Sequence, residues 1–359
     1  GQSPTAGDTL HPMDRRTFIH HDGALGDLLL SFPAIAAISA GAGLTHLAAR
    51  RDAALLLKQA GYVDKESPVD SSFYSSLYAG HPDRGVEKFL GRFERAFIFT
   101  TIEDSTVAKN IRRAVPHTRT ILTIPPQNLK THVVHYRLSQ LRGSGPCAGI
   151  GGGSQRGRCD SPGSLEVPAV YKQRAVESLA GLGWDFAGPL IALHPGSGGR
   201  RKCWPFQSYS DLASRIMRQY DPFLMFLSGP AEESNLGLMV SNLVKDLGKR
   251  AIHVRNKGLR EVSALLSLCD LYVGNDSGIS HLAALVNGRV IAVFGPTDPL
   301  LWRPVGERVT VVSPDRECAP CGDAESRACN EQRCLSGIPV DRVYDECSTY
   351  LESSALLWR

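Results

Sequence analysis

Residues 190–205, LIALHPGSGGRRKCWP, decide the fold of this chain. The first five are almost all apolar and predict a buried strand. Small residues follow at once and let the backbone approach a ligand closely, and residues 200–202 then add three cations. This pattern is typical of a diphosphate site at the end of a strand. The alternative is an ordinary strand-to-helix turn with solvated cations.

A second stretch, residues 273–284 (VGNDSGISHLAA), has the same organisation. A strand ends at its first glycine, and Asp276 or Ser277 can cap the helix that follows. The free N–H groups of residues 277–279 would then form an anion site, with His281 one helical turn further on. The alternative is a capped core helix whose histidine is merely hydrogen-bonded.

A third loop, residues 294–299 (FGPTDP), leaves the next strand in the same way and contains Thr297. Open α/β sheets bind ligands at the carboxyl ends of their parallel strands. We therefore expect the first two loops to form one site, which the third loop is placed to close.

Two α/β domains account for the 359 residues, a length that corresponds to about 2.4 domains of ordinary size. In the first half, strands alternate with helices in the manner of parallel βαβ units. Its strands are expected at residues 17–21, 44–48, 96–100 and 119–123, and its helices at 28–38 and 51–61. The second half predicts six strands, at residues 190–194, 223–228, 251–254, 271–274, 290–294 and 309–313, and a last helix at 340–356.

The domain boundary is expected near Ala187. Residues 1–14 are interpreted as a tag or disordered tail, 15–187 as the first domain and 188–359 as the second. Residues 142–168 are rich in Gly, Ser and Pro. They show neither the apolar spacing of a helix nor the alternation of a strand, which favours a mobile loop there.

The amino-acid composition limits which classes of ligand and which cellular compartment are expected. The chain has 40 Lys and Arg against 36 Asp and Glu, a formal net charge of +4. This charge is too small for a general nucleic-acid binder, but it favours an anionic ligand or an acidic membrane surface. Nine cysteines, an odd number at low density, favour a reducing compartment. No apolar run reaches the roughly 20 residues of a membrane span, and the first residues lack a secretory signal. We expect a cytoplasmic protein.

Four motifs resemble those of glycosyltransferase family nine, the heptosyltransferases of lipopolysaccharide inner-core synthesis. In the family order they are residues 23–27 (GALGD) with Pro33, 194–197 (HPGS) with 202–205 (KCWP), 275–278 (NDSG) with 281–284 (HLAA), and 294–299 (FGPTDP). Together they lie in a region from about residue 17 to residue 345, which makes the resemblance far more specific than a lone glycine pattern.

The resemblance implies a GT-B fold, an α/β architecture in which two Rossmann-like domains face each other across a cleft. The C-terminal domain would hold the sugar nucleotide and the N-terminal domain the acceptor. It further implies an inverting glycosyltransferase that needs no metal or other cofactor, with ADP-heptose as donor. The acceptor would be a lipopolysaccharide core or a related lipid-linked or oligosaccharide glycan. Such an acceptor is reached by peripheral contact with the cytoplasmic face of the inner membrane, and nucleic acid is not an expected partner.

Carried over onto matching positions, the family roles make Asp27 the general base and Lys202 a contact to the donor phosphates. The nucleotide site is expected to include Gly26, Ser197, Gly198, Glu232, Asp276, Ser277, Gly278, His281 and Thr297. The family also has an acidic residue near the ribose, for which Glu232 is the match, and Glu233 is an equal candidate for that role. From the residues alone, Asp27 also fits a simple helix N-cap.

Other polar groups have more than one interpretation. Cys318, Cys321, Cys329 and Cys334 have the spacing CxxC-x7-C-x4-C, which can form a four-thiolate zinc site, and free or structural thiols are the alternative. Residues 20–22 (HHD) are interpreted as strand-end polar groups. Arg112, Arg113 and Arg137 are interpreted as solvated surface cations, and contact with acceptor phosphates is the alternative.

Two other functions share these phosphate loops. A sugar-nucleotide epimerase or hydrolase would consume the nucleotide sugar without an acceptor. A nucleotide-sugar binding protein that has lost catalysis would not turn it over, although the aspartate in the first glycine loop argues against that function.

Overall fold

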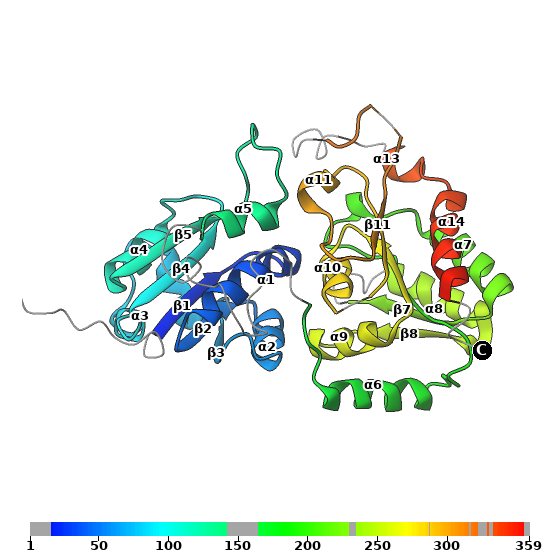
Figure 1. Ribbon diagram of the computed structural model, residues 1–359, viewed down its shortest axis with the longest axis horizontal. Helices are drawn as coiled ribbons and strands as arrows, with labels where there is room; N and C mark the ends of the chain where they lie inside the picture. The colour runs from blue at the N-terminus through cyan, green and yellow to red at the C-terminus, as the bar shows by residue number, and fades with distance from the viewer. Residues whose placement is uncertain are drawn as a thin grey trace, which may run out of the picture. The chain divides into compact units, whose positions relative to one another are not determined.

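The computed structural model describes residues 16–141, 164–229, 235–286, 288–315, 317–321, 329 and 333–354. The tail at residues 1–14, the loop at 142–163, and Glu232 with Glu233 lie outside the described residues. The chain divides into two compact units, each with its own parallel sheet (Figure 1). The second unit consists of Leu25–Leu30, Lys130–His132 and Pro162–Arg359, and the first contains the remainder of the chain.

The first sheet has five parallel strands in the order β3-β2-β1-β4-β5. The strands are β1 (Arg16–His21), β2 (Leu44–Ala49), β3 (Lys65–Pro68), β4 (Arg95–Thr100) and β5 (His117–Leu122). From β1 the chain continues to β2 on one side and returns to β4 on the other. The order therefore reverses between β1 and β4.

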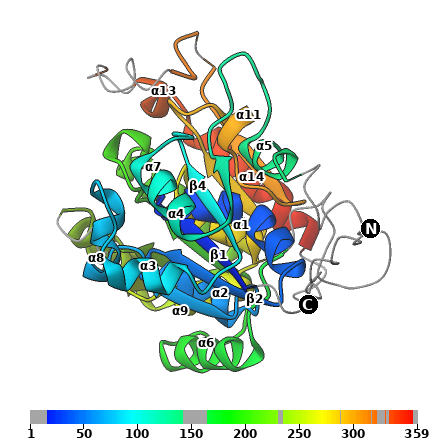
Figure 2. The same ribbon diagram turned by 90° about the vertical axis from the view of Figure 1, so that its left-hand side faces the viewer.

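The helical elements between β1 and residue 141 are α1 (Leu25–Ala40), α2 (Arg51–Gln59), η2 (Ser72–Tyr78), α3 (Arg84–Leu90), α4 (Thr106–Ala114) and α5 (Val133–Ser139). They belong to the first unit, except that the start of α1, Leu25–Leu30, is grouped with the second. One face of the sheet packs against η2, α3 and α4. In that core Phe18 of β1 is buried together with Leu77, Val86 and Ile111 from these three helices. Figure 2 shows α3 and α4 lying over this face.

The second sheet has six parallel strands in the order β11-β10-β9-β6-β7-β8. The strands are β6 (Leu190–His194), β7 (Phe223–Ser228), β8 (Ala251–Arg255), β9 (Leu271–Asn275), β10 (Val290–Val293) and β11 (Val309–Val312). The chain crosses from one half of this sheet to the other between β8 and β9, so β6 and β9 are neighbours.

The helical elements of the second unit are α6 (Ala169–Gly181), η4 (Arg200–Lys202), α7 (Phe206–Tyr220), α8 (Asn235–Leu247), η6 (Gly248–Arg250), α9 (Leu259–Leu268), α10 (Gly278–Leu285), α11 (Pro299–Trp302), α13 (Arg333–Ser336) and α14 (Val340–Ser354). Leu193 and Val273 of the sheet are buried together with Leu212 of α7, Val240 of α8 and Val343 of α14. These three helices therefore cover one face. Helix α6 packs against α9, as Figure 1 also shows, and this contact groups α6 with the second unit.

The expected α/β class with two parallel sheets is confirmed. Strands β6 and β7 have the expected bounds, and the other expected strands differ by a few residues at most. The sequence pattern did not predict β3, a four-residue edge strand with the composition KESP. Within the described residues, no helix combines the length and the apolar character that crossing a membrane requires.

Candidate functional site

Two loops of the second unit meet at the carboxyl edge of its sheet. Strands β6 and β9 are paired so that His194 lies opposite Gly274, and the loops that follow therefore begin side by side. The Lys202 ammonium donates a hydrogen bond to the Asp276 carboxylate, with 2.7 Å between Nζ and Oδ2. The Ser197 hydroxyl donates to the backbone carbonyl of Asp276 at 2.8 Å.

Asn275 is the residue that joins these loops most extensively, and the sequence interpretation gave it no role of its own. Its side chain is fully buried. Its Oδ1 accepts hydrogen bonds from the backbone N–H of Trp204 at 2.9 Å and from the Tyr209 hydroxyl at 3.0 Å. Its Nδ2 donates to the carbonyls of Pro195 and Gly196 at 2.9 and 3.1 Å. One amide thereby uses both donor hydrogens and both acceptor positions. The sequence signal that could have pointed to this role is the position of the amide side chain, between a buried strand and the N-cap of the next helix.

Helix α10 presents its N-terminus at the same edge. Ser277 is the N-cap, and its hydroxyl accepts a hydrogen bond from the Ser280 N–H at 3.3 Å. The first N–H groups of a helix have no acceptor within the helix, and they carry the positive end of its dipole. The loop thus has the geometry expected for binding an anion. Asp276, directly before the cap, is 6% exposed, and the Lys202 ammonium balances its charge.

Two histidines lie beside this helix start. His194 is 4% exposed, and burial lowers its pKa to about 4, so its ring is uncharged at neutral pH. Its Nδ1 lies 3.4 Å from the Ser277 hydroxyl. His281 is 6% exposed and belongs to the same unit as Gly26. A Cβ added to Gly26 would lie 3.3 Å from Cδ2 of His281, so a larger residue would crowd the imidazole.

The glycines of the site differ in what surrounds them. Gly278 is close-packed, because a Cβ there would lie 2.9 Å from the side chain of Leu25, which belongs to the same unit. Gly198 and Gly199 are exposed, and an added Cβ would meet no atom of the described chain within 4 Å. The loop after β6 is therefore open on its outer side, where a ligand could approach the backbone.

Asp27 lies in the first turn of α1 and is half-buried. The N-cap of that helix is Ala24, and no side chain caps it. The interpretation of Asp27 as the N-cap is therefore wrong, although a carboxylate in the first turn still complements the helix dipole. Thr297 follows β10 and is half-buried, and β10 pairs with β9, so its loop begins at the same edge as Asn275.

The cysteine-rich loop gives no described metal centre. All four cysteines are among the described residues, and within that part of the chain no group of three or more His, Cys, Asp or Glu side chains could hold a metal ion. The pKa of the Cys334 thiol is raised, first by burial and then by the nearby Cys318 and Cys329. The zinc site remains a hypothesis from the spacing alone.

Arg137 is not the solvated surface cation that the sequence suggested. Its side chain is fully buried, with Nε and Nη2 donating to the Thr123 carbonyl at 3.0 and 2.9 Å. Its Nη1 donates to the Ser31 hydroxyl at 2.8 Å, one helical turn beyond Asp27 on α1. Polarity alone could not reveal this burial, because the acceptors are a backbone carbonyl and a serine distant in sequence.

Comparison with known proteins agrees with the motifs. Residues 162–331 match the model of glycosyltransferase family 9 (heptosyltransferase), which confirms the resemblance. Lipooligosaccharide heptosyltransferase 2 of Haemophilus influenzae is 32% identical over 127 residues, 34% of this chain and 36% of that protein. Its counterpart from Campylobacter jejuni serotype O:2 is 26% identical over 172 residues, 46% of this chain and 52% of that protein. The chain thus spans about half, or less, of the length of these relatives.

Solved structures support the fold over nearly the whole chain. The ADP-heptose lipopolysaccharide heptosyltransferase II of Escherichia coli superposes with a TM-score of 0.70 and 16% identity, covering 95% of this chain and 99% of that one. A glycosyltransferase of family 9 from Veillonella parvula superposes with a TM-score of 0.76 and 17% identity. This match covers 95% of this chain and 98% of that one. At these identities the likeness establishes the fold, and it confirms the expected GT-B class.

Proposed function

We propose that this chain, whose residues 162–331 match the family 9 model, is an inverting glycosyltransferase that uses a nucleotide sugar. ADP-heptose is the proposed donor, and a lipopolysaccharide core or related glycan the proposed acceptor. The contact between Lys202 and Asp276 carries the proposal, because it joins two separate family motifs at the N-terminus of α10. We also propose a cytoplasmic location with peripheral contact to the inner membrane, which a lipid-linked acceptor requires.

The proposed reaction requires a base on the acceptor. An acceptor hydroxyl oxygen attacks the anomeric carbon from the face opposite the diphosphate, and the bond from that carbon to the diphosphate oxygen breaks with its electron pair. The proton of the hydroxyl passes to the carboxylate of Asp27. The product is a glycoside of inverted configuration, together with the nucleoside diphosphate.

The departing diphosphate gains negative charge that must be stabilised. Lys202 supplies a cation beside the helix start, and Arg200 and Arg201 of η4 add two more. The N–H groups at the start of α10 add fixed dipoles directed at the same place. A donor phosphate at this position can accept hydrogen bonds from the same ammonium that contacts Asp276.

A screen of nucleotide sugars tests the proposal most directly. A ligand that binds only the folded state raises the melting temperature by an amount that grows with the ratio of its concentration to its dissociation constant. We expect an ADP sugar to give the largest shift among the ADP, UDP, GDP and CMP sugars, and the Lys202→Met variant to reduce it. No stabilisation by any of them would overturn the nucleotide site.

Turnover then separates the alternatives. Consumption of the donor only in the presence of a glycan acceptor supports transfer. Consumption without acceptor would identify an epimerase or hydrolase instead. Binding without any turnover, over a range of acceptors, would identify a nucleotide-sugar binding protein.

A further inference from the structure

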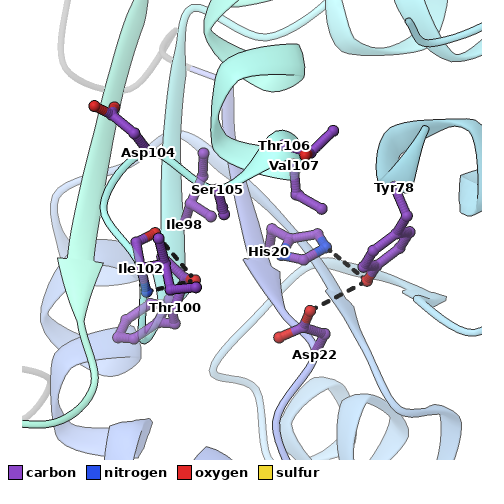
Figure 3. Close-up of a pocket in the computed structure, with 11 residues that line it drawn as sticks. His20, Asp22, Tyr78, Ile98, Thr100, Ile102, Asp104, Ser105, Thr106 and Val107 are labelled. Atoms are coloured by element: carbon purple, nitrogen blue, oxygen red, sulfur yellow. Dashed lines mark hydrogen bonds between the residues drawn. The ribbon is translucent and has the colours of Figure 1, made fainter. Parts of the chain in front are cut away.

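A cavity of about 450 Å³ lies in the first unit, and Figure 3 shows the side chains that line it. Strands β1 and β4 form its floor, and the end of η2 and the start of α4 form its walls. The residues that line it are His20, Asp22, Tyr78, Ile98, Phe99, Thr100, Ile102, Asp104, Ser105, Thr106 and Val107. The sequence interpretation treated His20 and Asp22 as strand-end polar groups only.

The cavity occupies the position at which open α/β sheets usually bind a ligand. Its floor is the carboxyl end of β1 and β4, where His20 lies opposite Ile98. The strand order of the sheet reverses between these two strands. Such a reversal opens a crevice outside the carboxyl ends of the strands.

The polar groups of the cavity form a chain that ends in a carboxylate. The Tyr78 hydroxyl donates a hydrogen bond to Oδ2 of Asp22 at 3.3 Å and lies 3.4 Å from Nε2 of His20, as Figure 3 shows. His20 is 1% exposed, and burial lowers its pKa to about 4 against the opposing effect of Asp22. The imidazole therefore adds no positive charge at neutral pH.

The charge of the cavity is negative. Its lining, all of it within the described residues, contains neither lysine nor arginine. Asp104 is paired with Arg112 at 2.6 Å, and the same guanidinium also donates to the Glu103 carbonyl and to the Thr120 hydroxyl. Asp22 is thus left to face the cavity with Tyr78.

The remaining lining suits a sugar ring. Ile98, Phe99, Ile102 and Val107 supply apolar surface for ring C–H groups. The side chains of Thr100, Ser105, Thr106 and Tyr78 supply hydroxyls, and Asp22 can accept hydrogen bonds from ligand hydroxyls. A phosphate or carboxylate on the ligand would instead meet the charge of Asp22 in a partly enclosed space.

We propose that this cavity binds an uncharged sugar unit and discriminates against sugars that carry phosphate or carboxylate. The inference rests on the proposed function in one respect, since the bound sugar would be part of the acceptor. The start of α4 alone would favour an anion. However, Ser105 already caps that helix by accepting from the Ala108 N–H at 3.2 Å, and Asp22 lies in the same cavity.

Saturation-transfer NMR on the full chain tests the binding. The uncharged probes are the methyl glycosides of glucose, galactose and mannose, and the anionic probes are glucuronic acid and glucose 6-phosphate. We expect at least one uncharged glycoside to bind at millimolar concentration, more tightly than either anion. Binding of an anionic probe in preference, or of none of the uncharged ones, would overturn the proposal.

Two variants locate the site. Thr106→Trp fills the cavity from an exposed position at the first residue of α4, and should abolish glycoside binding. Lys109→Trp, on an exposed position of the same helix outside the cavity, is the matched control. If both variants bind the glycoside like the unmodified chain, the cavity is not the site.

Asp22→Asn tests the discrimination by charge, because it keeps the volume and removes the carboxylate. We expect uncharged glycosides to bind on the order of tenfold more weakly, as for loss of one hydrogen bond to a charged group, and glucuronic acid to bind more tightly. Asp52→Asn, at an exposed position in the first turn of α2, is the control. An unchanged preference in Asp22→Asn would contradict the role of the carboxylate.

Nucleotide binding provides the independent readout. Each variant should retain the thermal shift given by ADP sugars, since the cavity and the loops after β6 and β9 lie in different units. Loss of glycoside binding with this shift intact would support the cavity. A chain that binds glycosides but no nucleotide would contradict the proposed function and leave the sugar site standing.

Discussion

The Lys202 ammonium and the Asp276 carboxylate lie 2.7 Å apart, although 74 residues separate them in sequence. Lys202 is 41% exposed and Asp276 is 7% exposed in their side chains. An ion pair so open to solvent on one side stabilises a fold only slightly. Its position at the start of α10 fits a role in ligand binding better than a role in stability.

Replacing Lys202 with methionine should therefore weaken nucleotide binding more than it lowers stability. We expect the dissociation constant of ADP to rise on the order of tenfold, because a charge-assisted contact to phosphate is lost. Isothermal titration calorimetry measures this dissociation constant. Lys257→Met, which breaks an exposed ion pair of the same unit, is the control. Equal ADP affinity in the two variants would contradict the role of Lys202.

Asp27→Asn should remove transfer and leave nucleotide binding nearly unchanged. General-base catalysis contributes roughly 10²- to 10⁴-fold to a rate, and the amide cannot accept the proton. Single-turnover kinetics with saturating donor measure the chemical step, and ADP titration checks the binding. Normal turnover in this variant would exclude Asp27 as the base.

Asn275→Asp should destabilise the second unit strongly. The carboxylate would face the carbonyl oxygens of Pro195 and Gly196, to which the amide now donates. Loss of two donors in a fully buried position should cost about 2–4 kcal/mol in the free energy of unfolding. Urea denaturation measures this. Asn235→Asp, exposed at the first residue of α8, should have little effect, and equal losses would refute the role of Asn275.

Two glycine substitutions should separate packing from binding. A Cβ at Gly295 would lie 2.5 Å from Cγ of Leu335, so Gly295→Ala should lower stability by about 1–3 kcal/mol. Gly198→Ala meets no neighbouring atom within 4 Å and should leave stability unchanged, while weakening ADP binding by crowding the ligand's approach. Thermal melting and ADP titration measure the two effects. A large loss of stability in Gly198→Ala would show that the loop is not open.

Stability should fall as the pH is lowered from about 6.5 towards 4. Burial lowers the pKa of His20, His46 and His194 to about 4 in the folded chain, whereas histidines of an unfolded chain titrate near 6.5. Over this interval the unfolded state binds more protons, so acid favours unfolding. Each histidine lowers the free energy of unfolding by at most about 2 kcal/mol as the pH falls from 6.5 to 5.

Urea denaturation at pH 7, 6 and 5 checks this dependence. The variant His46→Gln should reduce the slope of stability against pH. The matched control His117→Gln, at an exposed position of β5, should not. Equal slopes in the two variants would contradict the assignment of the effect to the buried histidine.

Much of the second sheet could be predicted because its strands are continuous apolar runs with glycine loops after them. All of the residues of β6 and most of those of β7 are buried, and such runs are easy to recognise. The edge strand β3 has no such run, and it exists because β2 offers it a backbone to pair with. The pattern of a single short segment does not contain that information.

The candidate site was predictable as a set of loops, but its internal connections were not. The sequence placed Lys202 and Asp276 in separate motifs, and only the pairing of β6 with β9 brings them into contact. The polar contacts of Asn275 and the burial of Arg137 depend likewise on partners distant in the chain. Periodicity and motif spacing describe local structure, so they leave such partners undetermined.

The four hydrogen bonds of Asn275 also bear on the kinetics of ligand exchange. They tie the loop after β6 to the end of β9 and to the start of α7 through groups of the chain itself. A binding loop that is already ordered loses little conformational entropy when its ligand arrives. We expect the backbone amide of Trp204 to exchange with solvent deuterium slowly, and at nearly the same rate with and without nucleotide. Association would then be governed by the encounter of nucleotide and site rather than by rearrangement of this loop.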